Sequence, residues 1–180
     1  MTIVDYQTIA CGDKFGSVYV LRLPETVNDD HANIVTGGNL WDHALLAGAP
    51  HQAETIASFY LSDIPTQIVK TAFKGHGREV LLVSTLQGGL YTLIPAKSKE
   101  EVLFYTHLEM FMRQEYMNLV QRDHLSFRSY FHPVKNIVDG DLCFKFINHL
   151  PFGKQQEFAE NVDRSVLEIV KKLEEVHDFL

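Results

Sequence analysis

The first half of the chain alternates apolar and polar residues in short runs, and a turn closes each run. Alternation with a period of two, rich in β-branched and aromatic residues, predicts strands with one buried face. The separators are clusters of Gly, Pro and Asp, which are typical of turns. A polar, glycine-containing stretch over 25–50 interrupts the pattern. We therefore expect about six strands, over residues 8–11, 17–23, 54–61, 66–73, 79–85 and 90–94.

Short strands at this spacing indicate either blades of a β-propeller or a small sandwich. A propeller contains roughly four or more blades of four strands each, so about six strands cannot close one. If the strands are blades, the chain holds only part of a propeller. An open blade edge would expose unpaired backbone groups, which tend to pair with another chain or to aggregate.

From Ser98 onward the apolar period changes from two to about three and a half, which predicts helices. Ser98 and Glu101 have the spacing of a capping box, in which the Ser98 hydroxyl accepts from the Glu101 amide and the carboxylate reaches back. A first helix is therefore expected to start at this position. Its apolar stripe comprises Phe104, Leu108, Phe111, Met112, Glu115 or Tyr116, and Leu119.

Two further helices are expected in the second half. One covers 139–150, with Asp139 as its N-cap, and the other covers 163–179. The fold class is therefore mixed, β first and α afterwards. We divide the chain into an antiparallel β part over 1–97 and a helical part over 98–180.

The charge balance gives little support for direct binding to nucleic acid. Sixteen Lys and Arg residues stand against 23 Asp and Glu residues, a formal net charge of −7, and no basic block interrupts the balance. The two cysteines, Cys11 and Cys143, lack the spacing of a zinc site or a disulfide framework, which fits a reducing compartment. Neither a signal peptide nor a membrane span is evident, so we expect a soluble, intracellular protein.

A search for catalytic and metal-binding patterns finds none that supports an enzyme. The nine histidines are scattered, and neither a nucleophile elbow nor a phosphate-binding glycine loop occurs. Asp139 and Asp141 lack the further oxygen ligands of a calcium loop, so a helix N-terminus is the favoured interpretation. Cys143 lies in an apolar helical stretch, where thiols usually fill a core. We expect no catalytic residue, no cofactor and no metal.

The segment 122–132 mixes basic and aromatic residues and permits two interpretations. In one, Arg122, Arg128, Tyr130 and Lys135 stack on and pair with a nucleic acid. In the other, the segment is a connector whose Arg and His side chains tie the helices to the β part. Its aromatic residues would then be buried, namely Phe127, Tyr130 and Phe131. The acidic composition favours the connector, so any contact with RNA should be indirect or weak.

This segment and its continuation, RDHLSFRSYFHPVKNIVDGDL, closely resemble the C-terminal signature of the splicing factor 3B subunit 3 family, the large propeller subunits of splicing factor 3b. Further matching stretches, in the same order along nearly the whole chain, are ACGDKFGSVYVLRLPE, NLWDHALLAGAP, STLQGGLYTLIP and VDRSVLEIVKKLEEV. The DGDL motif and the helix before it look more distantly like the damaged-DNA-binding large subunit and the cleavage and polyadenylation specificity factor A subunit. The signature residues, with a structural or partner-contact role, are Arg122, Asp123, His124, Phe127, Arg128, Tyr130, Asp139, Gly140 and Asp141.

The resemblance implies a nuclear scaffold without catalytic residues, built from three β-propellers and a C-terminal helical domain. On this comparison, 1–97 would be the last blades of a propeller and 98–180 the helical domain, at one end of a larger protein. The implied setting is the U2 snRNP, where the scaffold supports branch-site recognition. The implied partners are the HEAT-repeat subunit and the small helical subunit of splicing factor 3b, and the remaining propellers of the same scaffold. A nucleic-acid-binding module and, less favoured, a ubiquitin-ligase adaptor remain as alternatives.

Overall fold

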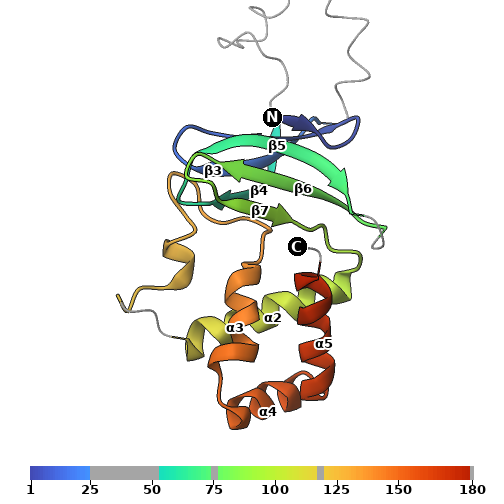
Figure 1. The fold of residues 1–180 in the computed structure, drawn as a ribbon, viewed down its shortest axis with the longest axis vertical. Coiled ribbons are helices and arrows are strands. Elements are labelled where there is room, and N and C mark those ends of the chain that lie inside the picture. The colour runs from blue at the N-terminus through green and yellow to red at the C-terminus, as the bar shows by residue number, and fades with distance from the viewer. Residues whose placement is uncertain (25–52, 74–76, 117–119, 179–180) are drawn as a thin grey trace, which may run out of the picture.

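In the part of the chain that the structure describes, two antiparallel sheets lie together at one end, and four α-helices gather at the other end (Figure 1). The computed structural model describes residues 1–24, 53–73, 77–116 and 120–178. The first sheet has the order β1 (Thr2–Ile3), β2 (Thr8–Gly12), β3 (Ser17–Arg22), β4 (Glu54–Tyr60). The second sheet has the order β5 (Pro65–Ala72), β6 (Glu79–Thr85), β7 (Leu90–Leu93).

The six strands expected from the periodicity are confirmed, each to within one residue at either end. The pattern does not predict β1, because two residues are too short to show a period. Several expectations fall outside the described residues. These are the stretch 25–50 with its NLWDHALLAGAP motif, Leu119, Phe179 and the histidines His31, His43, His51 and His76.

The two sheets share one hydrophobic core. Ala10 and Val18 of the first sheet are fully buried, as is Val83 of the second. Gly12 of the first sheet lies close against Pro65 of the second, since a Cβ on Gly12 would collide with the Pro65 ring. Glycine is therefore required at the end of β2, because any side chain would push the two sheets apart.

The helices are α2 (Lys99–Glu115), α3 (Gly140–His149), α4 (Phe152–Asn161) and α5 (Val166–His177). The start of α2 is as expected, with the Ser98 hydroxyl accepting from the Glu101 amide at 3.1 Å. The returning Glu101 carboxylate, however, accepts from the Lys97 amide and not from that of Ser98.

The expected third helix begins later than predicted. Asp163 has a left-handed φ of 51° and cannot begin a helix. Ser165 is the actual N-cap of α5, and it forms a complete capping box with Glu168. The sequence pattern also misses α4, because its N-cap is Pro151, which makes no side-chain capping bond.

The helices enclose a second core, centred on the buried face of α2. Its fully or almost fully buried members are Phe104, Leu108, Met112, Leu142, Cys143, Phe146, Phe158, Ala159, Ile169 and Leu173. Burial raises the pKa of the Cys143 thiol well above its usual value, which fits the predicted role of a core residue. The change from strands to helices falls at Ser98, whereas the domain boundary itself remains a prediction. Among the described helices, none has the length and apolarity needed to cross a membrane.

Candidate functional site at the connector between sheets and helices

Most residues of the family signature lie on one connector, which we define as residues 120–139. Gly140 and Asp141 follow it at the start of α3. The connector follows α2 in the chain, passes along the outer edge of β4 and returns to the start of α3 (Figure 1). The connector contains one short 3₁₀ helix, His124–Ser126, and is otherwise irregular. Its position decides which signature side chains face the protein and which face solvent.

The connector covers the outer edge of β4 with hydrogen bonds. Ser58 and Lys135 exchange two backbone bonds, of 3.1 and 3.0 Å, and the Tyr60 amide donates to the Arg128 carbonyl at 3.0 Å. Side chains add to this contact, since the Asn136 amide group donates to the Ile56 carbonyl at 2.8 Å. An edge strand left bare would offer these backbone groups to another chain, and the connector occupies them instead.

Asp139 is the point where the connector meets the helices. Its Oδ2 accepts from His124 Nε2 and from Arg128 Nε, both at 2.6 Å. Its Oδ1 accepts from the backbone amides of Asp141 and Leu142 and so caps α3, as the sequence predicts. Asp139 is only 3% exposed, so these bonds are protected from water.

Glu109 of α2 completes this network, and sequence analysis does not identify it. Its Oε1 accepts from the Asp139 amide at 3.0 Å, and the residue is buried. Burial, together with the nearby Asp139 charge, raises the pKa of the Glu109 carboxyl. Burial would also raise the pKa of Asp139, but the bonds and charges of His124 and Arg128 outweigh it and lower that pKa to about 2. Glu109 could have been noticed in the sequence, because it is an acidic residue next to Leu108 on the apolar face of α2.

Arg128 connects the network to the sheet. Its guanidinium lies 5.1 Å from the centre of the Phe59 ring on β4, while its Nε holds Asp139. Its Nη2 is also 3.6 Å from the carboxylate of Asp141, which is otherwise exposed. The Arg128 side chain is only 17% exposed, and Lys135 Nζ donates to the Thr55 carbonyl. These two cations are therefore engaged within the protein, which argues against their use on nucleic acid.

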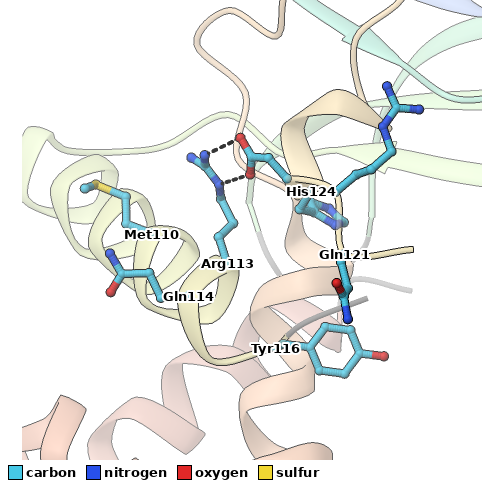
Figure 2. A pocket seen from close by; sticks show the side chains of 8 residues that line it. Met110, Arg113, Gln114, Tyr116, Gln121 and His124 are labelled. Atoms are coloured by element: carbon cyan, nitrogen blue, oxygen red, sulfur yellow. Dashed lines mark hydrogen bonds and ion pairs between the residues drawn. The ribbon is translucent and has the colours of Figure 1, made fainter. Parts of the chain in front are cut away.

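The other end of the signature lines a small pocket between the end of α2 and the connector (Figure 2). Arg113 and Asp123 form the double hydrogen bond drawn there, at 2.9 and 2.7 Å. These bonds from Arg113 lower the pKa of Asp123 below its usual value. The volume is about 470 Å³, and the lining residues are Met110, Arg113, Gln114, Tyr116, Gln121, Arg122, Asp123 and His124. Arg122 also lies over the Phe127 ring, 6.0 Å from its centre.

The expectation that the connector aromatics are buried is wrong. Phe127, Tyr130 and Phe131 are 37%, 55% and 65% exposed. Tyr130 stacks on Tyr60 with ring centres 5.3 Å apart, and Phe131 meets Phe15 edge to face at 5.1 Å. Tyr130 and Phe131 also meet each other edge to face, with ring centres 4.4 Å apart. Because the connector runs along the edge of β4, these rings pack against neighbouring side chains and remain partly exposed.

The remaining signature residue, Gly140, is the first residue of α3, and a Cβ added to it would meet no atom within 4 Å. The connector thus brings His124, Arg128 and Asp139 together, and leaves Gly140 and Asp141 at the surface. Across the described part of the chain, no three His, Cys, Asp or Glu side chains gather closely enough to hold a metal ion. The arrangement joins α2, the connector and α3.

Comparison with known proteins identifies the family. The protein family described as "CPSF A subunit region" matches residues 1–148, which is most of the chain. The chain belongs to the CPSF A subunit region family. The chain is 45% identical, over 97% of its length, to a probable splicing factor 3B subunit 3 of Dictyostelium discoideum. The values are the same for splicing factor 3B subunit 3 of Danio rerio.

The Arabidopsis thaliana protein named spliceosome-associated protein 130 A is 40% identical over 97% of this chain. The expected resemblance to splicing factor 3B subunit 3 is therefore confirmed. This chain spans about 14% of the length of each of these relatives. The names of the relatives describe splicing factors rather than enzymes.

Proposed function

We propose that the chain is a non-catalytic interaction scaffold in pre-mRNA splicing, as the C-terminal part of a splicing factor 3b subunit. The observation that carries this proposal is the 45% identity with splicing factor 3B subunit 3 over 97% of the chain. On this proposal the protein acts in the nucleus, within the U2 snRNP, and supports branch-site recognition. It makes its contribution through shape and contacts, not through a reaction.

The fold supports this proposal in two ways. The first sheet has four antiparallel strands in sequence order, which is the make-up of a propeller blade. We therefore propose that the sheets are the last blades of a propeller and that the helices form the following domain. The second support is the connector, which fixes the helices to the sheets through the buried carboxylate of Asp139. A scaffold requires such a fixed orientation between the parts that its partners contact.

The proposed partners are the HEAT-repeat subunit and the small helical subunit of splicing factor 3b, with the remaining propellers of the scaffold. A chimera tests this proposal directly. Residues 1–180 replace the matching 14% of the Danio rerio subunit, and the tagged chimera is purified from cells of that organism. We expect the HEAT-repeat subunit to co-purify, as it does with the unmodified subunit measured in parallel. Recovery of no spliceosomal protein by a folded chimera would refute the proposal.

Direct binding to RNA can be tested with the unmodified chain of 180 residues. The proposed scaffold predicts weak or undetectable binding of the chain to single-stranded RNA. Binding through phosphates would instead fall steeply as salt is raised. The salt dependence of the unmodified chain is the cleaner measurement, because Arg128→Ala would also break the ion pair with Asp139. A steep salt dependence would favour the nucleic-acid-binding alternative.

A further inference from the structure

Four aromatic side chains form one contiguous group on the surface beside β4. We call them the aromatic cluster: Phe15, Tyr60, Tyr130 and Phe131. Tyr130 stacks on Tyr60 with ring centres 5.3 Å apart and meets Phe131 edge to face at 4.4 Å. Phe15 completes the cluster, with its ring centre 5.1 Å from that of Phe131. Phe15, Tyr130 and Phe131 are 45%, 55% and 65% exposed, so the cluster presents ring surface to solvent. A contiguous apolar patch on a surface marks a site of interaction.

The backbone holds the aromatic cluster in place in the free chain. Phe15 lies in the turn between β2 and β3, where its amide donates to the Asp13 carboxylate at 2.9 Å. The Leu61 amide donates to the Gly16 carbonyl at 2.8 Å, which fixes this turn to the end of β4. Gly16 has a left-handed φ of 101°, and a Cβ on it would lie 3.1 Å from the Tyr60 ring. Rings that are already in place lose little conformational freedom on binding, so the cluster is preorganised.

The charges around the aromatic cluster favour a negatively charged partner. The exposed Lys14 holds its ammonium group 5.0 Å from the centre of the Phe15 ring. The two carboxylates of the neighbouring turns are engaged within the protein. Asp13 accepts from amides of its own turn and from the Tyr19 hydroxyl, and Asp63 accepts from two backbone amides. Lys14 would therefore attract a carboxylate of the partner and repel a cationic segment from the rings.

Proline-rich segments suit exposed rings of this kind. Such a segment adopts the extended polyproline II helix, which has no internal hydrogen bonds and docks on aromatic surfaces at a low cost in entropy. Proline rings can pack on Phe15 and Phe131, and the Tyr130 hydroxyl can donate to a backbone carbonyl of the segment. Single-stranded RNA also stacks on aromatic rings, but its phosphates require several cations. Arg128 and Lys135, the basic residues of the connector beside the cluster, are engaged within the protein.

We propose that the aromatic cluster binds an acidic, proline-rich segment of a partner protein, with proline rings on the aromatic side chains and a carboxylate beside Lys14. The segment binds in the polyproline II conformation. This contact goes beyond the partners of the proposed scaffold function, and it adds a site for a flexible peptide to that scaffold.

Fluorescence anisotropy with the chain of 180 residues tests the site. The probe is a fluorescent peptide with a central run of prolines and with glutamates at both ends. We expect saturable binding with a Kd below about 1 mM. Phe131→Ala should weaken this binding about tenfold, because it removes the most exposed ring of the cluster. The matched control is Phe152→Ala, which removes a ring that is 63% exposed on α4 and should leave the affinity unchanged.

Changes in the peptide test the chemistry of the partner. A peptide with alanines in place of the prolines should bind about tenfold more weakly than the proline peptide. A peptide with lysines in place of the glutamates should also bind more weakly, and Lys14→Gln should abolish that preference. Nuclear magnetic resonance supplies a readout that needs no substitution and decides the question if Phe131→Ala fails to fold. The proline peptide should shift the amide signals of Gly16 and Phe131 and leave that of Phe152 in place.

Four results would overturn the proposal. The unmodified chain could show no saturable binding, or it could bind the proline and alanine peptides equally well. Equal effects of Phe131→Ala and Phe152→Ala, with signals shifted only outside the cluster, would place the peptide on another surface. Tighter binding of a fluorescent single-stranded RNA, lost in Phe131→Ala, would identify a nucleic acid as the occupant. None of these results bears on the chimera experiment, so the scaffold function stands or fails separately through the HEAT-repeat subunit.

Discussion

Replacement of Asp139 by asparagine should separate the charge of the connector network from its geometry. Asparagine is as good an N-cap as aspartate, so Asp139→Asn keeps the cap of α3 and removes the negative charge. Arg128 and His124 then lose their common carboxylate in a site where Asp139 is 3% exposed and both partners are 17% exposed. A pKa lowered from 3.8 to about 2 corresponds to about 2.5 kcal/mol of stability at neutral pH. Part of this loss is offset, because Glu109 no longer faces a second carboxylate.

We therefore expect Asp139→Asn to lower the free energy of unfolding by about 2 kcal/mol at pH 7, measured by urea denaturation. Asp139→Ala also removes the cap and should add about 1 kcal/mol to the loss. The control is Asp141→Asn in the same turn, where the carboxylate is 79% exposed and 3.6 Å from Arg128. This control should change stability by less than about 1 kcal/mol.

The pH dependence provides a second check on the same variant. Because the pKa of Asp139 is lowered on folding, its contribution is present above pH 3.8 and is lost as the pH falls toward 2. The difference between the unmodified chain and Asp139→Asn should therefore shrink over this range. If Asp139→Asn and Asp141→Asn destabilise the chain equally, to within about 0.5 kcal/mol, the reasoning about the buried ion pair is wrong.

Three further predictions concern the helical core and its buried groups. Leu108→Ala should lower the free energy of unfolding by about 2–5 kcal/mol in a urea titration, because Leu108 is fully buried. The control Leu103→Ala, at a position 47% exposed, should change it by less than about 1 kcal/mol. Iodoacetamide at pH 8 should modify Cys11 in the native protein and Cys143 only after denaturation, which mass spectrometry can follow. The reason is that Cys143 is buried and that its thiol pKa is raised more than that of Cys11. Equal labelling rates would contradict its burial. Glu109→Gln should preserve or increase stability at pH 7, because a carboxyl whose pKa is raised on folding destabilises the protein once it is ionised. The urea midpoints of the variant and the unmodified chain should converge near pH 4, where the Glu109 carboxyl is protonated in the folded chain. A large loss at pH 7 would show that the Glu109 charge itself is required.

The connector shows where inference from sequence fails. The capping role of Asp139 follows from local rules, because its carboxylate bonds to amides two and three residues further along the chain. Its contacts with His124 and Arg128, and that of Glu109 with its amide, join residues 11 to 30 positions apart. No period or spacing encodes such contacts. The prediction that the connector aromatics are buried was wrong for a related reason. Apolar character does not reveal whether a segment crosses a core or runs along the edge of a sheet.

The sequence by itself determined what depends on neighbours along the chain. Periods of two and of about three and a half placed six strands and the helices α2 and α3, because each element must bury one face. Motif matches likewise determined the family. Tertiary structure alone decided that the connector covers β4 and that Asp139 draws α2, the connector and α3 to one point. These features depend on which segments pack side by side in space, and that arrangement minimises exposed apolar area and unpaired backbone groups over the whole molecule rather than over any window of sequence.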